Sequence, residues 1–119
     1  MEEEKSLLRE AEAAVEELAF AVSDIALSKK LRNSKLCVYV NLTTCENKDY
    51  CVELTSRGWR IVSLYHDNVS ELTEDNGDEA VNHYYETMYQ LLNALSPEYR
   101  RRFSSKIAAE LERHLSSGT

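Results

Sequence analysis

Six side chains of this sequence have the chemistry of nucleophiles or of acid–base catalysts. They are Cys37, Cys45, Cys51, His66, His83 and His114. A cysteine activated by a nearby imidazole is a nucleophile, and an enzyme built from this chain would use Cys51 or His66. However, the sequence contains no HExxH, GxSxG, GxxxxGK or GxGxxG motif, which are the patterns of common hydrolases and nucleotide-binding enzymes. We therefore expect core cysteines, surface histidines, no catalytic residues and no enzyme.

Oxygen atoms that could bind a metal ion are concentrated in one polar segment, residues 66–80. They come from Asp67, Glu71, Glu74, Asp75, Asn76, Asp78 and Glu79. A calcium-binding EF-hand loop needs oxygens at alternating positions, a central glycine and a final glutamate. The run Asp75-Asn76-Gly77-Asp78 does not fit that register. We expect a solvated acidic loop, with no metal site and no cofactor.

The charge of the chain disfavours nucleic acid and anionic membranes as partners. The formal net charge is −7, and both kinds of surface bind clustered positive charge. A short basic run, Arg100-Arg101-Arg102, is present. On a helix its three side chains point about 100° apart, so they do not converge on one phosphate. We expect them on a helix surface, where one could pair with an acidic patch on a partner.

The length and the cysteine pattern indicate one domain, residues 1–119, in a reducing compartment. Three cysteines without a CxxC spacing cannot form a complete disulfide framework. The acidic start, Met1-Glu2-Glu3-Glu4, does not fit a secretion signal. No apolar run approaches the length of a membrane span. We expect the protein in the cytoplasm, with the nucleus as a second compartment.

The hydrophobic pattern predicts an α+β fold with an N-terminal helix, a three-stranded antiparallel meander and two C-terminal helices. The first helix is predicted over residues 5–29, from apolar residues spaced three and four apart. The predicted strands cover residues 35–43, 50–54 and 59–65, and the last two helices cover residues 81–95 and 97–115. Ser96-Pro97 separates these helices, because serine caps a helix and proline is favoured at its first position.

Two helical stripes could bind a partner or pack in the core. On the last helix, Phe103, Ile107, Leu111 and Leu115 are spaced four residues apart, which is typical of a helix that binds in a groove. On the first helix the stripe consists of Leu8, Val15, Leu18, Val22 and Ile25. The spacing alone does not separate docking from ordinary packing in either helix.

From about Glu10 to Leu115 the sequence resembles the glycogen synthase kinase-3 interaction proteins (GSKIP), whose domain also occurs near the N-terminus of clustered-mitochondria proteins. Several stretches carry the resemblance together. They are Glu10-Ala11-Glu12-Ala13, Phe20-Ala21-Val22, Tyr50-Cys51-Val52-Glu53-Leu54-Thr55, Glu86-Thr87-Met88-Tyr89-Gln90-Leu91-Leu92, Leu95-Ser96-Pro97-Glu98-Tyr99-Arg100, Phe103 and Glu110-Leu111-Glu112.

The resemblance implies binding to glycogen synthase kinase-3 through the C-terminal helix, with inhibition of the kinase. That helix is similar to the kinase-binding helix of axin, and Phe103, Ile107 and Leu111 occupy matching positions. Leu111 matches the leucine most closely tied to kinase binding in the family. The implied mechanism is occupancy of a hydrophobic groove away from ATP, in competition with axin-like scaffolds.

The resemblance also implies an alternative partner, the type II regulatory subunit of protein kinase A. Vertebrate members anchor this subunit through the N-terminal helix, here with Leu8, Val15, Leu18 and Val22. Val15 matches one apolar position of the anchoring motif, but Ala19 stands where the motif has leucine. The smaller side chain removes about 2 kcal/mol of apolar burial. The sequence therefore favours binding to glycogen synthase kinase-3 over anchoring of protein kinase A.

Overall fold

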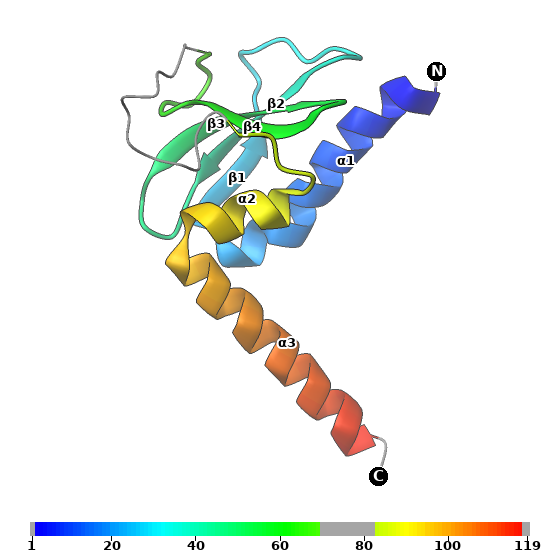
Figure 1. The fold of residues 1–119 in the computed structure, drawn as a ribbon, viewed down its shortest axis with the longest axis vertical. Helices are drawn as coiled ribbons and strands as arrows, with labels where there is room; N and C mark the ends of the chain where they lie inside the picture. The colour runs from blue at the N-terminus through cyan, green and yellow to red at the C-terminus, as the bar shows by residue number, and fades with distance from the viewer. Residues whose placement is uncertain (1, 70–82, 118–119) are drawn as a thin grey trace.

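The computed structural model describes the backbone of residues 2–69 and 83–117 and the side chains of residues 7–69 and 83–115. It consists of α1 (Glu2–Leu18), the 3-10 helix η1 (Ala19–Ala21), β1 (Asp24–Leu27), β2 (Val38–Thr43), β3 (Asp49–Thr55), β4 (Gly58–Ser63), α2 (Met88–Leu95) and α3 (Pro97–Ser117). The predicted α+β class is confirmed, but the sheet has four strands where three were predicted. The helices α1 and α2 pack on the sheet, and α3 extends away from the body (Figure 1).

The sheet is an antiparallel meander in the order β1-β2-β3-β4. Its core face follows from the alternation of side chains along a strand. Val40 of β2 pairs with Val52 of β3, and Val52 pairs with Ile61 of β4. These residues are buried in one cluster with Leu18 of α1 and Leu91 of α2. One face of the sheet therefore carries the core, and two helices cover it.

The first predicted helix is too long, because its final part contains the 3-10 helix η1 and then the strand β1. The helix ends at Leu18, Val22 is extended, and β1 pairs with β2 from Asp24↔Thr43 to Leu27↔Val40. Ile25 is buried against the core in this strand, as it would have been in a helix. Strand pairing supplies the backbone hydrogen bonds that the helix would have made, and branched residues such as Val22 and Ile25 favour the extended state. The missing fourth strand is thus β1.

The helix predicted over residues 81–95 begins at Met88. Thr87 caps it, since its hydroxyl accepts a hydrogen bond from the Gln90 N–H, and the Gln90 side chain accepts one from the Thr87 N–H. This reciprocal pair is a capping box. Just before it, Tyr85 exchanges two backbone hydrogen bonds of 2.8 Å with Trp59 of β4, so this segment is extended. Residues 81 and 82 lie outside the described residues.

The strand ends also differ from the prediction. β2 begins at Val38, three residues late, and Leu36 before it is exposed. β4 ends at Ser63, so Tyr65 is outside the strand and exposed. The loop predicted over residues 66–80 is described only to residue 69, where Asp67 accepts hydrogen bonds from the Ser28 hydroxyl and the Asn41 amide. The first part of this loop is therefore fixed to the sheet.

Candidate functional site

The outer part of α3 is a helix whose described side chains all face solvent. From Ser104 to Leu115 every residue is exposed. Three of them are large and apolar: Ile107 is 43 % exposed, Leu111 is 58 % exposed and Leu115 is 73 % exposed. Their spacing of four residues places them on one side of the helix. We call Ile107, Leu111 and Leu115 the α3 face.

Phe103, the first residue of the predicted stripe, belongs partly to the core. Its ring stacks on Tyr99 with centroids 5.6 Å apart and meets Tyr89 edge-on at 5.8 Å. Tyr99 is buried, and Phe103 is half-buried against the core cluster. Phe103 therefore joins α3 to α2, and the stripe emerges into solvent one turn later.

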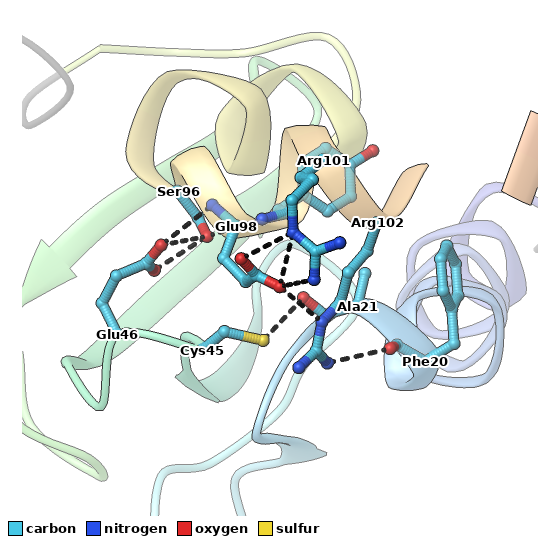
Figure 2. A network of polar contacts seen from close by, with 9 residues as sticks. Phe20, Ala21, Cys45, Glu46, Ser96, Glu98, Arg101 and Arg102 are labelled. Atoms are coloured by element: carbon cyan, nitrogen blue, oxygen red, sulfur yellow. Dashed lines mark hydrogen bonds and ion pairs between the residues drawn. The ribbon is translucent and has the colours of Figure 1, made fainter. Parts of the chain in front are cut away.

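The base of α3 is held by Ser96 and by a glutamate from the turn between β2 and β3. The buried Ser96 hydroxyl accepts from the Tyr99 N–H at 3.0 Å and donates to the Glu46 carboxylate at 2.8 Å (Figure 2). The same carboxylate accepts from the Glu98 N–H at 3.0 Å. Two of the free N–H groups of the helix start are thus satisfied, and a negative charge lies at the positive end of the helix dipole. The predicted Ser-Pro boundary is confirmed.

The electrostatics of this cap favour an ionised Glu46. Burial by itself would raise the pKa of its carboxyl group. The hydrogen bonds from the Glu98 N–H and the Ser96 hydroxyl outweigh that effect, and the pKa of Glu46 is lowered overall. A carboxylate that accepts several hydrogen bonds is stabilised in its charged form. Glu46 therefore acts as an anionic cap at neutral pH.

The basic run binds within the chain. Arg101 and Arg102 both donate to the Glu98 carboxylate, and the Nη1 of Arg102 also donates to the backbone oxygen of Phe20 in η1 at 3.3 Å (Figure 2). The bond from Arg101 is the main reason that the pKa of Glu98 falls to about 2. Arg100 donates to the backbone oxygen of Asn93. Arg101 and Arg102 thus meet at one carboxylate of the same helix, whereas Arg100 points to a different acceptor.

The candidate residues of the first helix do not form one exposed surface. Leu8 is exposed and Val15 is half-buried, but Leu18 and Val22 are buried in the core. Val22 also lies beyond the end of α1 and η1, in the extended segment before β1. Ala19 is exposed at the start of η1. Of the four predicted residues, two are therefore buried in the core and only Leu8 is exposed.

The hydrogen bonds of His66, one of the two residues of the enzyme hypothesis, are made to groups other than a cysteine. Cys51 is fully buried, and burial is the main reason that its pKa rises to about 11, which keeps the thiol protonated. The Nε2 of His66 lies 3.0 Å from the Leu42 backbone oxygen and 3.2 Å from the Thr43 hydroxyl. Cys37, Cys45 and Cys51 are all free thiols. Nothing in these contacts activates a cysteine by a histidine.

No group of three or more histidine, cysteine, aspartate or glutamate residues is placed to hold a metal ion in residues 7–69 and 83–115. No helix among these described residues has the length and hydropathy that crossing a bilayer requires. The acidic residues from Glu71 to Glu79 lie outside them.

Two sets of structural features were not predicted from the sequence. Glu46 and Phe20 hold the base of α3 from positions far away in the chain, and no local pattern marks them. Glu10 and Glu17 border a hollow beside α1. The sequence could have indicated this hollow, because Glu10 and Glu17 are seven residues apart on one helical face and lie on either side of the small residues Ala13 and Ala14.

The sequence is similar to a known domain family and to several known proteins. The model of the GSKIP domain matches residues 7–114. The GSK3-beta interaction protein of Danio rerio is 38% identical over 116 residues, which are 98% of this chain and 82% of the relative. The GSK3B-interacting protein of Homo sapiens is 38% identical over 108 residues, which are 91% of this chain and 73% of the relative.

A more distant relative is similar over a shorter stretch. The Protein GSKIP homolog of Drosophila melanogaster is 33% identical over 98 residues, or 81% of this chain and 76% of the relative. The family match covers most of α1, the whole sheet, α2 and most of α3. Of the α3 face it includes Ile107 and Leu111 but not Leu115. The chain belongs to the GSKIP domain family.

Proposed function

We propose that this protein is a non-catalytic module that binds glycogen synthase kinase-3 through the α3 face. Relatives that align over most of the chain are named GSK3-beta interaction proteins. The observation that supports the helix as the binding element is the exposure of Ile107, Leu111 and Leu115 at four-residue spacing. Exposed large apolar residues grouped on one helix mark interaction sites in soluble proteins.

The geometry suits a helix that inserts into a hydrophobic groove. The α3 face needs no rearrangement of the core, because it is uncovered while Tyr99 and Phe103 hold the helix base. Burying each of the three side chains contributes roughly 1.5–3 kcal/mol, offset by the lost motional freedom of both partners. Micromolar to nanomolar affinity corresponds to about 8–12 kcal/mol, so these three side chains supply only part of it and the rest of the interface supplies the remainder.

Inhibition is the second part of the proposal. A helix in a groove away from ATP excludes other helices from that groove, including the similar helix of axin-like scaffolds. It therefore blocks phosphorylation of scaffold-delivered substrates and leaves a short peptide substrate unaffected. Kinase assays with both substrate types test this: equal inhibition of both would contradict the mechanism, and an axin-derived helical peptide is expected to displace the protein.

Anchoring of protein kinase A has less support in this chain. Leu18 and Val22 are buried in the core, so a partner that binds all four predicted residues would have to detach α1 from the sheet. Detaching them exposes two large apolar side chains, at a cost of about 3–6 kcal/mol. We keep this alternative as a prediction from the family resemblance, and no contact described above favours it.

The central experiment is calorimetric titration of the kinase with the protein and two alanine variants. Leu111→Ala removes about 2 kcal/mol of apolar burial and should weaken the dissociation constant roughly thirtyfold. Arg113→Ala is the matched control, since it shortens an exposed side chain about 200° around the same helix. Its affinity should equal that of the unmodified chain. Equal affinities of all three proteins would disprove the binding surface, and no binding by the unmodified chain would disprove the function.

A further inference from the structure

A hollow of about 280 Å³ lies between α1, the start of β4 and the start of α2, away from the α3 face. Its walls come from residues that are far apart in the sequence. They are Glu10, Ala13, Ala14, Glu17, Trp59, Thr87, Met88 and Tyr89. The volume lies just below the range of pockets for drug-sized ligands, which begins at about 300 Å³. The hollow therefore fits a single long side chain better than a cofactor.

The hollow has an apolar floor and an acidic rim because of the order of residues on α1. Glu10, Ala13, Ala14 and Glu17 follow the spacing of three, four and seven residues that defines one helical face. The two alanines leave room in the middle, since larger side chains there would fill the space against Trp59 and Met88. The carboxylates stand at the two ends, with Cα atoms about 10 Å apart.

Both carboxylates are fixed by aromatic donors and keep acceptor capacity. The Trp59 Nε1–H donates to the Oε2 of Glu10 at 3.2 Å, and the Tyr89 hydroxyl donates to the Oε2 of Glu17. A carboxylate has about four acceptor positions, so one donor leaves most of them open. Among the described residues, neither glutamate forms an ion pair with a lysine or arginine. The rim therefore presents two oriented negative charges.

We propose that this hollow receives an arginine side chain from a partner polypeptide. The apolar stem lies on the floor of Ala13, Ala14 and Met88, and the guanidinium group pairs with the open oxygens of Glu10 or Glu17. Arginine side chains combine an apolar stem with a charged end, and their flat donor group also stacks on aromatic rings such as Tyr89. The net charge of −7 adds a long-range attraction for a basic partner.

This site is independent of kinase binding through the α3 face. The hollow and the α3 face share no residue, and Tyr89, which lines the hollow, contacts Phe103 at the base of α3. Trp59 is the only tryptophan in the sequence, so its indole N–H gives a single nuclear magnetic resonance signal from the wall of the hollow. That signal reports occupancy without any kinase in the sample.

The experiment titrates the full chain with two capped tripeptides, Ala-Arg-Ala and Ala-citrulline-Ala, while the Trp59 indole signal is followed. Citrulline has the shape of arginine without its charge. The arginine peptide should move the signal with a dissociation constant of about 1 mM, and the citrulline peptide should bind about threefold to fivefold more weakly. Equal binding of both peptides, or no movement up to about 10 mM, would overturn the proposal.

Two glutamine variants separate the hollow from general attraction to an acidic helix. Glu17→Gln removes one rim charge, and should weaken the arginine peptide about threefold with little change for the citrulline peptide. Glu16→Gln removes an exposed charge from the same helix outside the hollow, and should leave both unchanged. An equal loss in the two variants would show non-specific attraction and overturn the proposal.

Discussion

The guanidinium group of Arg102 donates to the backbone oxygen of Phe20 at 3.3 Å, across 82 positions of the sequence. This contact joins the first turns of α3 to the end of η1, beside the bonds that Arg102 and Arg101 make to Glu98 (Figure 2). The ammonium group of Lys106, one turn further on, lies 4.3 Å from the centre of the Phe20 ring. The direction in which α3 leaves the body is therefore set at its base.

Replacing Arg102 by alanine should loosen this base. The Arg102→Ala chain loses the bond to Phe20 and one of the bonds to Glu98, and we expect its free energy of unfolding to fall by about 1 kcal/mol. Urea unfolding followed by circular dichroism measures the change. Arg113→Ala, on the exposed outer part of α3, should stay within about 0.5 kcal/mol of the unmodified chain. Indistinguishable midpoints for the two variants would show that the contact with Phe20 contributes no stability.

The pKa of Glu98 predicts how stability depends on acid. In the folded chain the bonds from Arg101, and then from Arg102, hold it at about 2, against an ordinary value of 4.5. A lowered folded pKa means that the stabilisation is fully present above pH 4.5 and is lost as the pH falls toward 2. The lowered pKa of Glu46 acts in the same direction.

The Glu98→Gln variant tests this acid dependence. Its free energy of unfolding should be lower than that of the unmodified chain at neutral pH. This difference in free energy should become smaller when urea unfolding is repeated at lower pH. The narrowing follows because glutamine has no charge to lose. A gap that stays constant down to about pH 3 would mean that Glu98 is not ionised against the arginines in the folded chain.

Most of the fold could be predicted from local patterns, and the missed strand β1 lies where two patterns overlap. Alternation along residues 38–43 identified β2, and Ser96-Pro97 identified the start of α3. Val22 and Ile25 continued the helical spacing of Leu18 by coincidence, so β1 was read as helix. Only the pairing of β1 with β2 decides between the two, and that pairing is not local.

The site shows the same division between local and distant information. The spacing of Ile107, Leu111 and Leu115 was readable, but their exposure was not, because the same spacing serves core packing. Exposure depends on where α3 points, and this is fixed by Glu46 and Phe20, which are distant in sequence. The structure thus supplies the one property of the stripe that separates docking from packing.

Gly58 should tolerate no side chain. Its φ is +122°, and a Cβ atom there would lie 2.5 Å from the backbone oxygen of Tyr85. That oxygen accepts a hydrogen bond from the Trp59 N–H, one of the two backbone bonds between Tyr85 and Trp59 of β4. Gly58→Ala should therefore lower the free energy of unfolding by about 2 kcal/mol and increase hydrogen exchange at the Trp59 amide. Ser56→Ala, in the same turn and exposed, is the control, and equal stability of both variants would refute the close contact.

The α3 face should contribute to binding and not to folding, which is a distinction that paired alanine variants can measure. Leu91 of α2 is fully buried in the core, so Leu91→Ala should cost about 3 kcal/mol of unfolding free energy. Ile107 is exposed, and Ile107→Ala should change the free energy of unfolding by less than about 0.5 kcal/mol. If Ile107→Ala is instead as costly as Leu91→Ala, the outer part of α3 folds back on the body in solution. The kinase would then have to displace it before binding, and the affinity would be reduced by the cost of that displacement.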